Sequence, residues 1–241
     1  MDSSHLTLNT THLARHAAET LAATADRFAY LLLLVGALMV LVTCTAYALA
    51  GPVAAMPAGA ASFDVARAAT PAAVGWMLLA CWAGMPGDVV LAVAGLMLAQ
   101  RRGQPPQVTA GWYALAIVGL VFLLVDTMVG QVLPPLATGG PEAAAAYAGA
   151  RTLFDALFHM GTFVGGLSGL ALAWAPGGRP RGWGPLMRLS GMLGIIAGAA
   201  GLIGWGLPQA TGGAVTLLVL ALAGWGWTGL RASQHTWHRS G

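Results

Sequence analysis

The sequence predicts an all-α, polytopic integral membrane bundle of six transmembrane helices with both termini in the cytoplasm. Of its 241 residues, 57% are hydrophobic and only 8% are charged, whereas soluble domains carry roughly a quarter of charged residues. The mean hydropathy is +0.73, and apolar runs long enough to cross a bilayer, about 20 residues each, recur along the chain. This composition excludes an ordinary soluble fold.

Six apolar segments, separated by Pro, Gly and Arg, define the domain organisation. The expected spans are residues 29–50, 71–99, 108–132, 143–175, 186–207 and 213–231. They form a transmembrane domain over 29–231, which follows a cytoplasmic segment, 1–28, and precedes a cytoplasmic tail, 232–241. Within 1–28, apolar residues recur at near-helical spacing opposite Arg15 and Glu19. This pattern favours an interfacial amphipathic helix, with a frayed tail as the alternative.

The basic residues set the expected orientation, because short cytoplasmic loops are enriched in them. All 11 are Arg. With the N-terminus inside, the cytoplasmic segments contain Arg15, Arg27, Arg101, Arg102, Arg179, Arg181, Arg188, Arg231 and Arg239. Only Arg67 and Arg151 fall on the other side. This topology accounts for the pI near 9.3 without a nucleic-acid partner. No cleavable signal is recognised, so we expect the bacterial inner (cytoplasmic) membrane.

The second span is expected to bend near Asp88. It is longer than a straight crossing needs, and Pro86 removes a backbone donor and pushes against the preceding turn. Small residues at 161–169 and 191–206 are expected to let neighbouring helices approach closely in lipid. The segment 84–96 also weakly matches 191–202, which would fit two inverted repeats of three spans.

Ionisable residues inside the spans define the candidate site. A charge at the bilayer centre costs at least about 2.5–3.5 kcal/mol, so such residues usually face the bundle interior and mark function. These residues are Asp88, Asp126, Arg151, Asp155 and His159. For Asp88 and Asp126, the structural alternative is a neutral carboxyl group bonded to a backbone carbonyl or a nearby Thr.

The fourth span has the most informative pattern. Tyr147, Arg151, Asp155 and His159 follow one another at steps of four, so they share one helical face. We expect Arg151 to keep Asp155 ionised and Asp155 to orient His159 or keep it protonated. Such a group can store or pass a proton. The alternative is an internal ion pair with a hydrogen-bonded His that fixes helix packing.

The residue types disfavour several cofactor chemistries. Without Lys, the chain cannot form a retinal Schiff base. His159 is the only His in any expected span, so a bis-histidine haem lacks a second ligand. Carboxylates near His159 would suit a divalent ion, but one His with scattered Asp residues is too weak a pattern to assign a metal, and no cofactor is identified. Cys44 and Cys81 lie in different spans and are expected to be buried, unreactive thiols.

Tryptophan residues have two expected roles. Most lie near span ends, as in an interfacial aromatic belt: Trp76, Trp112, Trp183, Trp205, Trp225 and Trp227. Trp82 instead lies well inside the second span, about a turn and a half before Asp88. It is expected either to wall a ligand pocket or simply to pack.

Together these features predict a buried polar site that binds a small solute, with Asp126, Asp155 and His159 coupling the solute to a proton, as in a transporter. The expected binding residues are Asp88, Asp126, Tyr147, Arg151, Asp155, His159 and Trp82. One alternative is an intramembrane enzyme using Asp155 and His159 as acid and base on a lipid-soluble substrate, although no known nucleophile or metal motif is present. Another is an accessory subunit of a membrane complex. The expected partners are membrane lipids and a small or lipophilic ligand. The sequence is also compatible with a homo-oligomer.

Overall fold

The computed structural model describes residues 4–51, 63–174 and 182–237, which are helical apart from short connections. Six helical stretches are long and apolar enough to cross a membrane. They are Thr20–Ala50, Phe63–Ala99, Pro106–Thr138, Glu142–Ala173, Gly184–Leu202 and Gln209–Ser233. The all-α fold with six spans is therefore confirmed, and the chain is a multi-pass membrane protein. The membrane in which it lies and the side on which its termini lie stay predictions.

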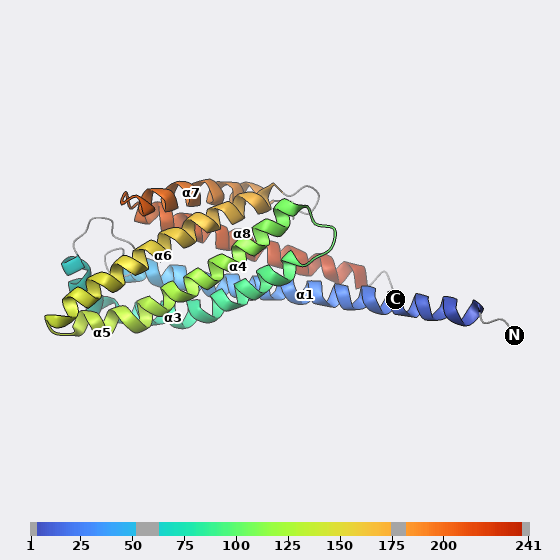
Figure 1. Cartoon of the computed structure of the whole chain (residues 1–241), viewed down its shortest axis with the longest axis horizontal. Coiled ribbons are helices and arrows are strands. Elements are labelled where there is room, and N and C mark those ends of the chain that lie inside the picture. Colours follow the sequence, from blue (N-terminus) through green and yellow to red (C-terminus); the bar gives the residue numbers. More distant parts are fainter. Residues whose placement is uncertain (1–3, 52–62, 175–181, 238–241) are drawn as a thin grey trace.

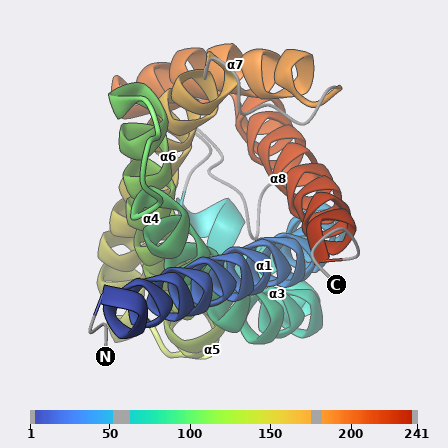
Figure 2. The same ribbon diagram turned by 90° about the vertical axis from the view of Figure 1, so that its right-hand side faces the viewer.

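The helices form a ring in chain order (Figures 1 and 2). They are α1 (Ser4–Ala50), α3 (Phe63–Ala99), α4 (Pro106–Thr127), α5 (Leu133–Thr138), α6 (Glu142–Ala173), α7 (Gly184–Leu202) and α8 (Pro208–Trp237). A π-helical segment, η1 (Met128–Val132), joins α4 to α5. Each long helix packs against the next one in sequence, and α8 closes the ring against α1. The start of α1 and the end of α8 lie at the same end of the bundle, which we call the terminal end (Figure 1).

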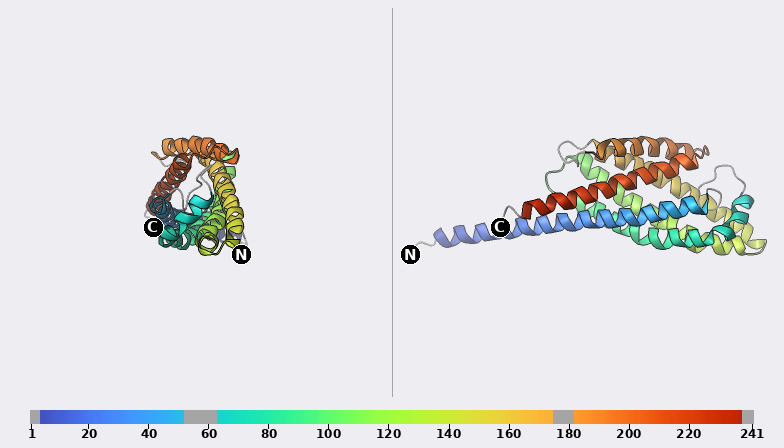
Figure 3. Two further views of the ribbon diagram at one scale, coloured as in Figure 1. Left: turned by 90° about the vertical axis from the view of Figure 1, so that its left-hand side faces the viewer. Right: turned by 180° about the vertical axis from the view of Figure 1, so that it is seen from behind.

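The first helix differs from the expected arrangement. A separate interfacial helix was expected within 1–28, but α1 continues without a break from Ser4 to Ala50. Its first part extends beyond the ring along the helix axis (Figure 3). The reason lies in the sequence, because the first Gly is Gly36 and the first Pro is Pro52, so no helix-breaking residue separates the polar segment from the span.

Small residues let the helices approach closely, as predicted. A Cβ atom added at Gly166 of α6 would lie 2.6 Å from the backbone nitrogen of Ile195 in α7, so only Gly fits there. Buried hydroxyl groups also bridge helices. Ser168 donates to the Gly111 carbonyl over 2.9 Å, and Ser190 donates to the Ala214 carbonyl over 2.9 Å.

Two hydrophobic clusters fill the ring. The first, toward the terminal end, includes Leu33, Leu98, Leu115 and Leu222. The second, toward the opposite end, includes Met77, Val125, Val129, Phe154 and Phe158. The region between them is the place where polar side chains enter the interior, as described below.

The tryptophan belt is only partly as predicted. Trp112 and Trp225 are buried in the first cluster, with ring centroids 5.1 Å apart in an edge-to-face arrangement. Their assignment to the belt was therefore wrong, because they face each other across the ring rather than the lipid. Trp76, Trp205 and Trp227 are exposed on the outer surface, as belt residues are.

Candidate functional site

A cavity of about 320 Å³ lies inside the ring, between the last turns of α1 and the first turns of α8. Residues of α1 and α8 form two of its sides, and Asp88 of α3, Phe122 and Asp126 of α4 and Phe158 of α6 complete it. Its walls are mostly apolar. This size is at the lower end of the range of small-molecule sites, about 300–1,000 Å³.

Two carboxyl groups meet at this cavity. Asp88 and Asp126 are both buried, and their carboxyl groups lie close enough to interact. The Tyr47 hydroxyl of α1 donates a further hydrogen bond to Oδ1 of Asp126. Two ionised carboxylates this close in an apolar interior would repel each other and would both lack solvation. We therefore expect the pair to hold at least one proton and to carry at most one negative charge.

Close packing of three helices fixes the position of Asp126. Oδ2 lies against the backbone of Gly84 in α3, where an added Cβ atom would be only 1.5 Å away. Thr43 of α1 lies beside the same glycine and donates to the Met39 and Ala80 carbonyls over 3.3 Å each. Any side chain at position 84 would therefore displace the carboxyl group.

Asp88 is less completely satisfied than Asp126. Its Oδ2 atom is buried and has no hydrogen-bond partner within the described part of the chain. A buried polar atom of this kind is costly unless a ligand or another group bonds to it. Asp88 is also one of the residues that line the cavity.

No basic side chain of the described residues neutralises the Asp88–Asp126 pair. Across the described ranges, the residues that line the cavity include neither Arg nor His. Within the described ranges, ion pairs join Arg101 to Asp26 at 2.7 Å and Arg151 to Asp155 at 3.0 Å. None of these four residues lines the cavity. The ionised form of the pair would thus be a negative charge in an apolar cavity without a described counter-charge.

The helix that carries Asp126 changes its geometry two residues later. Met128–Val132 form the π-helical turn η1, in which the Leu133 N–H donates to the Met128 carbonyl. Pro134 and Pro135 follow directly and have no N–H of their own, so the ordinary helical pattern is interrupted here. π-helical turns occur frequently at functional sites. The sequence prediction ends this span at residue 132, but the apolar helix runs on to Thr138.

The polar residues of the fourth span form a separate group. Arg151 is buried and pairs with Asp155, as expected for residues four apart. The hydroxyl groups of Tyr147 and Thr70 are 3.0 Å apart and hydrogen-bonded, which ties α6 to α3. None of Tyr147, Arg151 and Asp155 lines the cavity. The structure therefore divides the predicted site residues into two groups rather than bringing them together.

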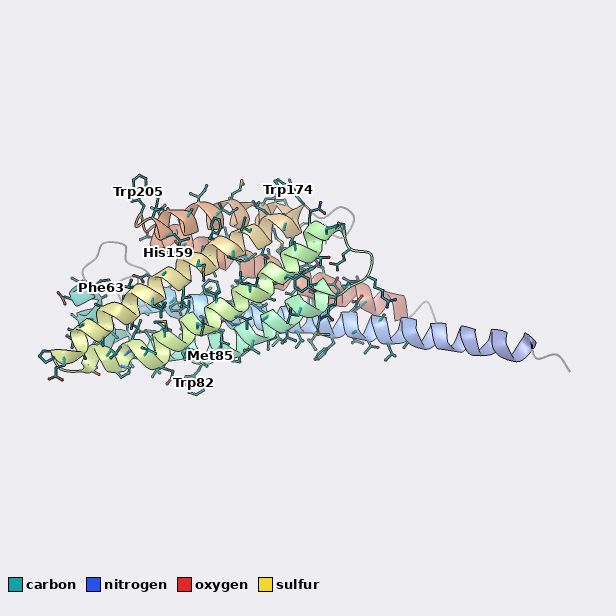
Figure 4. The ribbon with its side chains drawn as sticks, in the orientation of Figure 1. Phe63, Trp82, Met85, His159, Trp174 and Trp205 are labelled. Carbon is teal, nitrogen blue, oxygen red and sulfur yellow. The ribbon has the colours of Figure 1, made fainter. Side chains whose placement is uncertain are left out.

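The expected Asp155–His159 pair is not formed. His159 lies between α6 and α7 (Figure 4), and its Nδ1 atom would be 2.0 Å from a Cβ atom added at Gly201. That nitrogen has no hydrogen-bond partner among the described residues, and the Asp155 carboxylate bonds to Arg151. The His159 ring turns toward the space that Gly201 leaves on α7, which prevents the acid–base arrangement expected from the sequence.

Trp82 does not wall the cavity. Its side chain is 69% exposed and projects outward from α3 (Figure 4). Trp82 lies six positions before Asp88 in the sequence, so the two side chains are on different faces of one helix. Conversely, Tyr47 and Thr43 take part in the site and were missed, although Tyr47 is a phenol inside an otherwise apolar span. Cys44 and Cys81 are both free, as predicted, and Cys44 lines the cavity.

The fold and site together define a multi-pass helical membrane protein with a carboxyl pair at an internal cavity. Comparisons with models of known families, with curated proteins and with solved structures find no match to this chain. Its function must therefore be argued from the geometry of the site itself.

Proposed function

We propose that this protein is a proton-coupled carrier for a small organic cation, which binds at the Asp88–Asp126 pair. The observation that supports this most directly is the close approach of two buried carboxyl groups at a ligand-sized cavity. The proposal keeps the predicted coupling of a solute to a proton. It assigns that coupling to Asp88, Asp126 and Tyr47 in place of Asp155 and His159.

The charge of the pair provides the coupling. With two protons the pair is neutral, and with one proton it carries a single negative charge that the apolar walls do not compensate. A monovalent cation compensates that charge as well as the second proton does. The cation and the proton therefore compete, and one proton leaves when one cation binds.

The walls favour a cation with an apolar body. Phe122 and Phe158 form one side of the cavity, with ring centroids 5.6 Å apart. Val40 and Val215 add aliphatic surface from α1 and α8. Aromatic faces attract alkylammonium groups by about 0.5–2 kcal/mol each, more when water is excluded. An ammonium group bearing alkyl or aryl substituents fits this combination of acid and apolar surface.

The packing of the ring supports access from one end. Toward the terminal end, the first hydrophobic cluster, with Trp112 and Trp225, fills the interior. Toward the opposite end, Ala48 and Gln209 line the cavity and are exposed. We expect the solute to reach the acid pair from that end, between α1 and α8. Release on the terminal side would require the Trp112–Trp225 contact to open.

The test uses the whole protein in detergent and a permanent cation, benzyltrimethylammonium. Its binding is measured by titration calorimetry, and the released proton by a pH indicator in weak buffer. We expect one site that releases up to one proton, and much weaker binding of neopentylbenzene, the neutral analogue of the same shape. Asp88→Asn and Asp126→Asn should both lose cation binding, whereas the exposed Asp64→Asn should keep it. Unchanged binding in both cavity variants, or equal affinity for the neutral analogue, would overturn the proposal.

A further inference from the structure

We infer that a groove between α1 and α8 at the terminal end binds one anionic phospholipid. The groove, which we call the basic groove, has a volume of about 700 Å³ and is lined chiefly by Arg27, Phe28, Leu31, Trp227, Leu230 and Arg231. It shares no lining residue with the carboxyl cavity. The inference is thus independent of the proposed transport function.

The spacing of these residues explains the shape of the groove. On each helix they recur at steps of three and four, so each set occupies one face. The adjacent faces make the contact between the helices, because Cβ atoms added at Gly226 and Gly229 would lie 2.8 and 2.5 Å from Leu34 and Tyr30. Two helices that touch along this line leave a groove on their outer side, which faces the lipid.

The basic groove carries two positive charges that no carboxylate of the described ranges neutralises. Asp26 is the acid next to Arg27 in sequence, but it forms an ion pair with Arg101 at 2.7 Å. Arg101 also donates a hydrogen bond to the Tyr30 hydroxyl over 2.5 Å. Neither Arg27 nor Arg231 has a carboxylate partner within the described ranges. The Arg231 guanidinium lies over the Trp227 ring, 4.5 Å from its centroid. A phosphate group supplies the missing negative charge and suits the planar guanidinium donors.

The order of charged and apolar residues along the helices matches a phospholipid. Arg27 lies directly before the apolar run 28–50, and Arg231 lies two residues before the end of the Gln209–Ser233 span, so we place both at headgroup depth. Leu31 on α1 and Trp227 on α8 lie one turn deeper and are both more than 40% exposed. Arginine at the headgroup with apolar surface below it fits a phosphodiester and its acyl chains, whereas a free phosphate would use the arginines alone.

The first experiment needs no variant. The intact protein in detergent is titrated with dioleoyl phosphatidylglycerol, with dioleoyl phosphatidylcholine and with inorganic phosphate, and bound molecules are counted by native mass spectrometry. We expect one phosphatidylglycerol to be retained per chain in preference to phosphatidylcholine, and excess inorganic phosphate to leave it in place. Equal retention of the two lipids would overturn the inference, and so would displacement by phosphate, because the ligand would then be a free anion.

The second experiment assigns the site. Arg27→Gln and Arg231→Gln should each weaken phosphatidylglycerol binding by about fivefold, the value expected for one arginine at an anionic headgroup. Arg102→Gln is the matched control, since Arg102 is exposed at the same end but lies outside the groove. If Arg102→Gln weakens binding as much, the effect is general surface charge and the inference fails. The inference also fails if the double variant Arg27→Gln/Arg231→Gln binds phosphatidylglycerol as tightly as the parent protein does.

All three arginines in this experiment are exposed, so their replacement should leave the fold intact, which circular dichroism and gel filtration would verify. Benzyltrimethylammonium binding should be unchanged in the groove variants, because the cavity is lined by other residues. Failure of the lipid inference and failure of the transport proposal would therefore be seen in different measurements.

Discussion

The Tyr47 hydroxyl donates a hydrogen bond to Oδ1 of Asp126, which joins the first span to the third inside the membrane. The same carboxyl group lies close to that of Asp88 and against Gly84 of α3. Three helices therefore hold one acid side chain in a single orientation. Such a preorganised group avoids the cost of rearrangement when a ligand or a proton arrives.

Replacing Tyr47 by Phe removes this hydrogen bond and keeps the ring that packs against Phe158 at 6.3 Å. We expect a loss of about 1–3 kcal/mol in the free energy of unfolding, the usual cost when a buried polar group loses its partner. Unfolding in mixed detergent micelles measures this loss. Tyr113→Phe is the control, because Tyr113 is 45% exposed on the outside of α4. Equal losses in the two variants would contradict a special role for the Tyr47 hydroxyl.

Gly84→Ala tests the space in which the Asp126 carboxyl group lies. The new methyl group would begin 1.5 Å from Oδ2, so the carboxyl group must move. We expect about 1–3 kcal/mol of destabilisation from overpacking and weaker binding of benzyltrimethylammonium. Gly75→Ala in the same helix has no atom within 4 Å of the new Cβ. It should be neutral or stabilising by up to about 1 kcal/mol. A stable Gly84→Ala variant with normal binding would show that the carboxyl position is unimportant.

Competition between the cation and a proton has a fixed sign. Lowering the pH adds the second proton to the pair and removes the charge that a cation needs. The apparent dissociation constant for benzyltrimethylammonium should therefore rise as the pH falls, by at most about tenfold per pH unit for a one-to-one exchange. Calorimetry over a series of pH values measures this slope. Asp126→Asn should show no binding at any pH in the series, and a constant affinity in the parent protein would rule out coupling.

Asp155→Asn tests whether the polar residues of the fourth span are independent of the Asp88–Asp126 pair. The change removes a charged partner from Arg151, whose side chain is 1% exposed, so we expect about 1–3 kcal/mol of destabilisation. Cation binding should persist, because Asp155 does not line the cavity. Glu142→Gln, at an exposed position in the first turn of the same helix, should cost less. Loss of binding in a folded Asp155→Asn protein would mean that the fourth span takes part in the site after all.

The number and type of spans could be predicted because the bilayer imposes a length and an apolar composition on every crossing helix. The Arg151–Asp155 contact could also be predicted, since both residues lie on one helix at a spacing of four. Both predictions depend on local chain geometry alone. They need no knowledge of which helix lies beside which.

The carboxyl pair could not be predicted in the same way. Asp88 and Asp126 lie in different helices, and their contact depends on the rotation of α3 against α4 and on the space at Gly84. The same limit explains the error at His159, where a glycine on a different helix decides the direction of the ring. Trp82 was a different case. Its six-residue separation from Asp88 is sufficient to place it on another face of α3.

Closure of the ring has a consequence for biosynthesis. Neighbouring helices in the ring are also neighbours in sequence, apart from α1 and α8, so most pairs can form while the chain is still being inserted. The cavity and the basic groove both depend on α8. A nascent chain whose sixth span has not yet been inserted therefore lacks both the cavity and the basic groove. Its Asp88–Asp126 pair is then not covered on the side where α8 will lie. The ligand binding that we propose would thus be acquired in the last step of assembly, when the earliest and the latest parts of the chain meet.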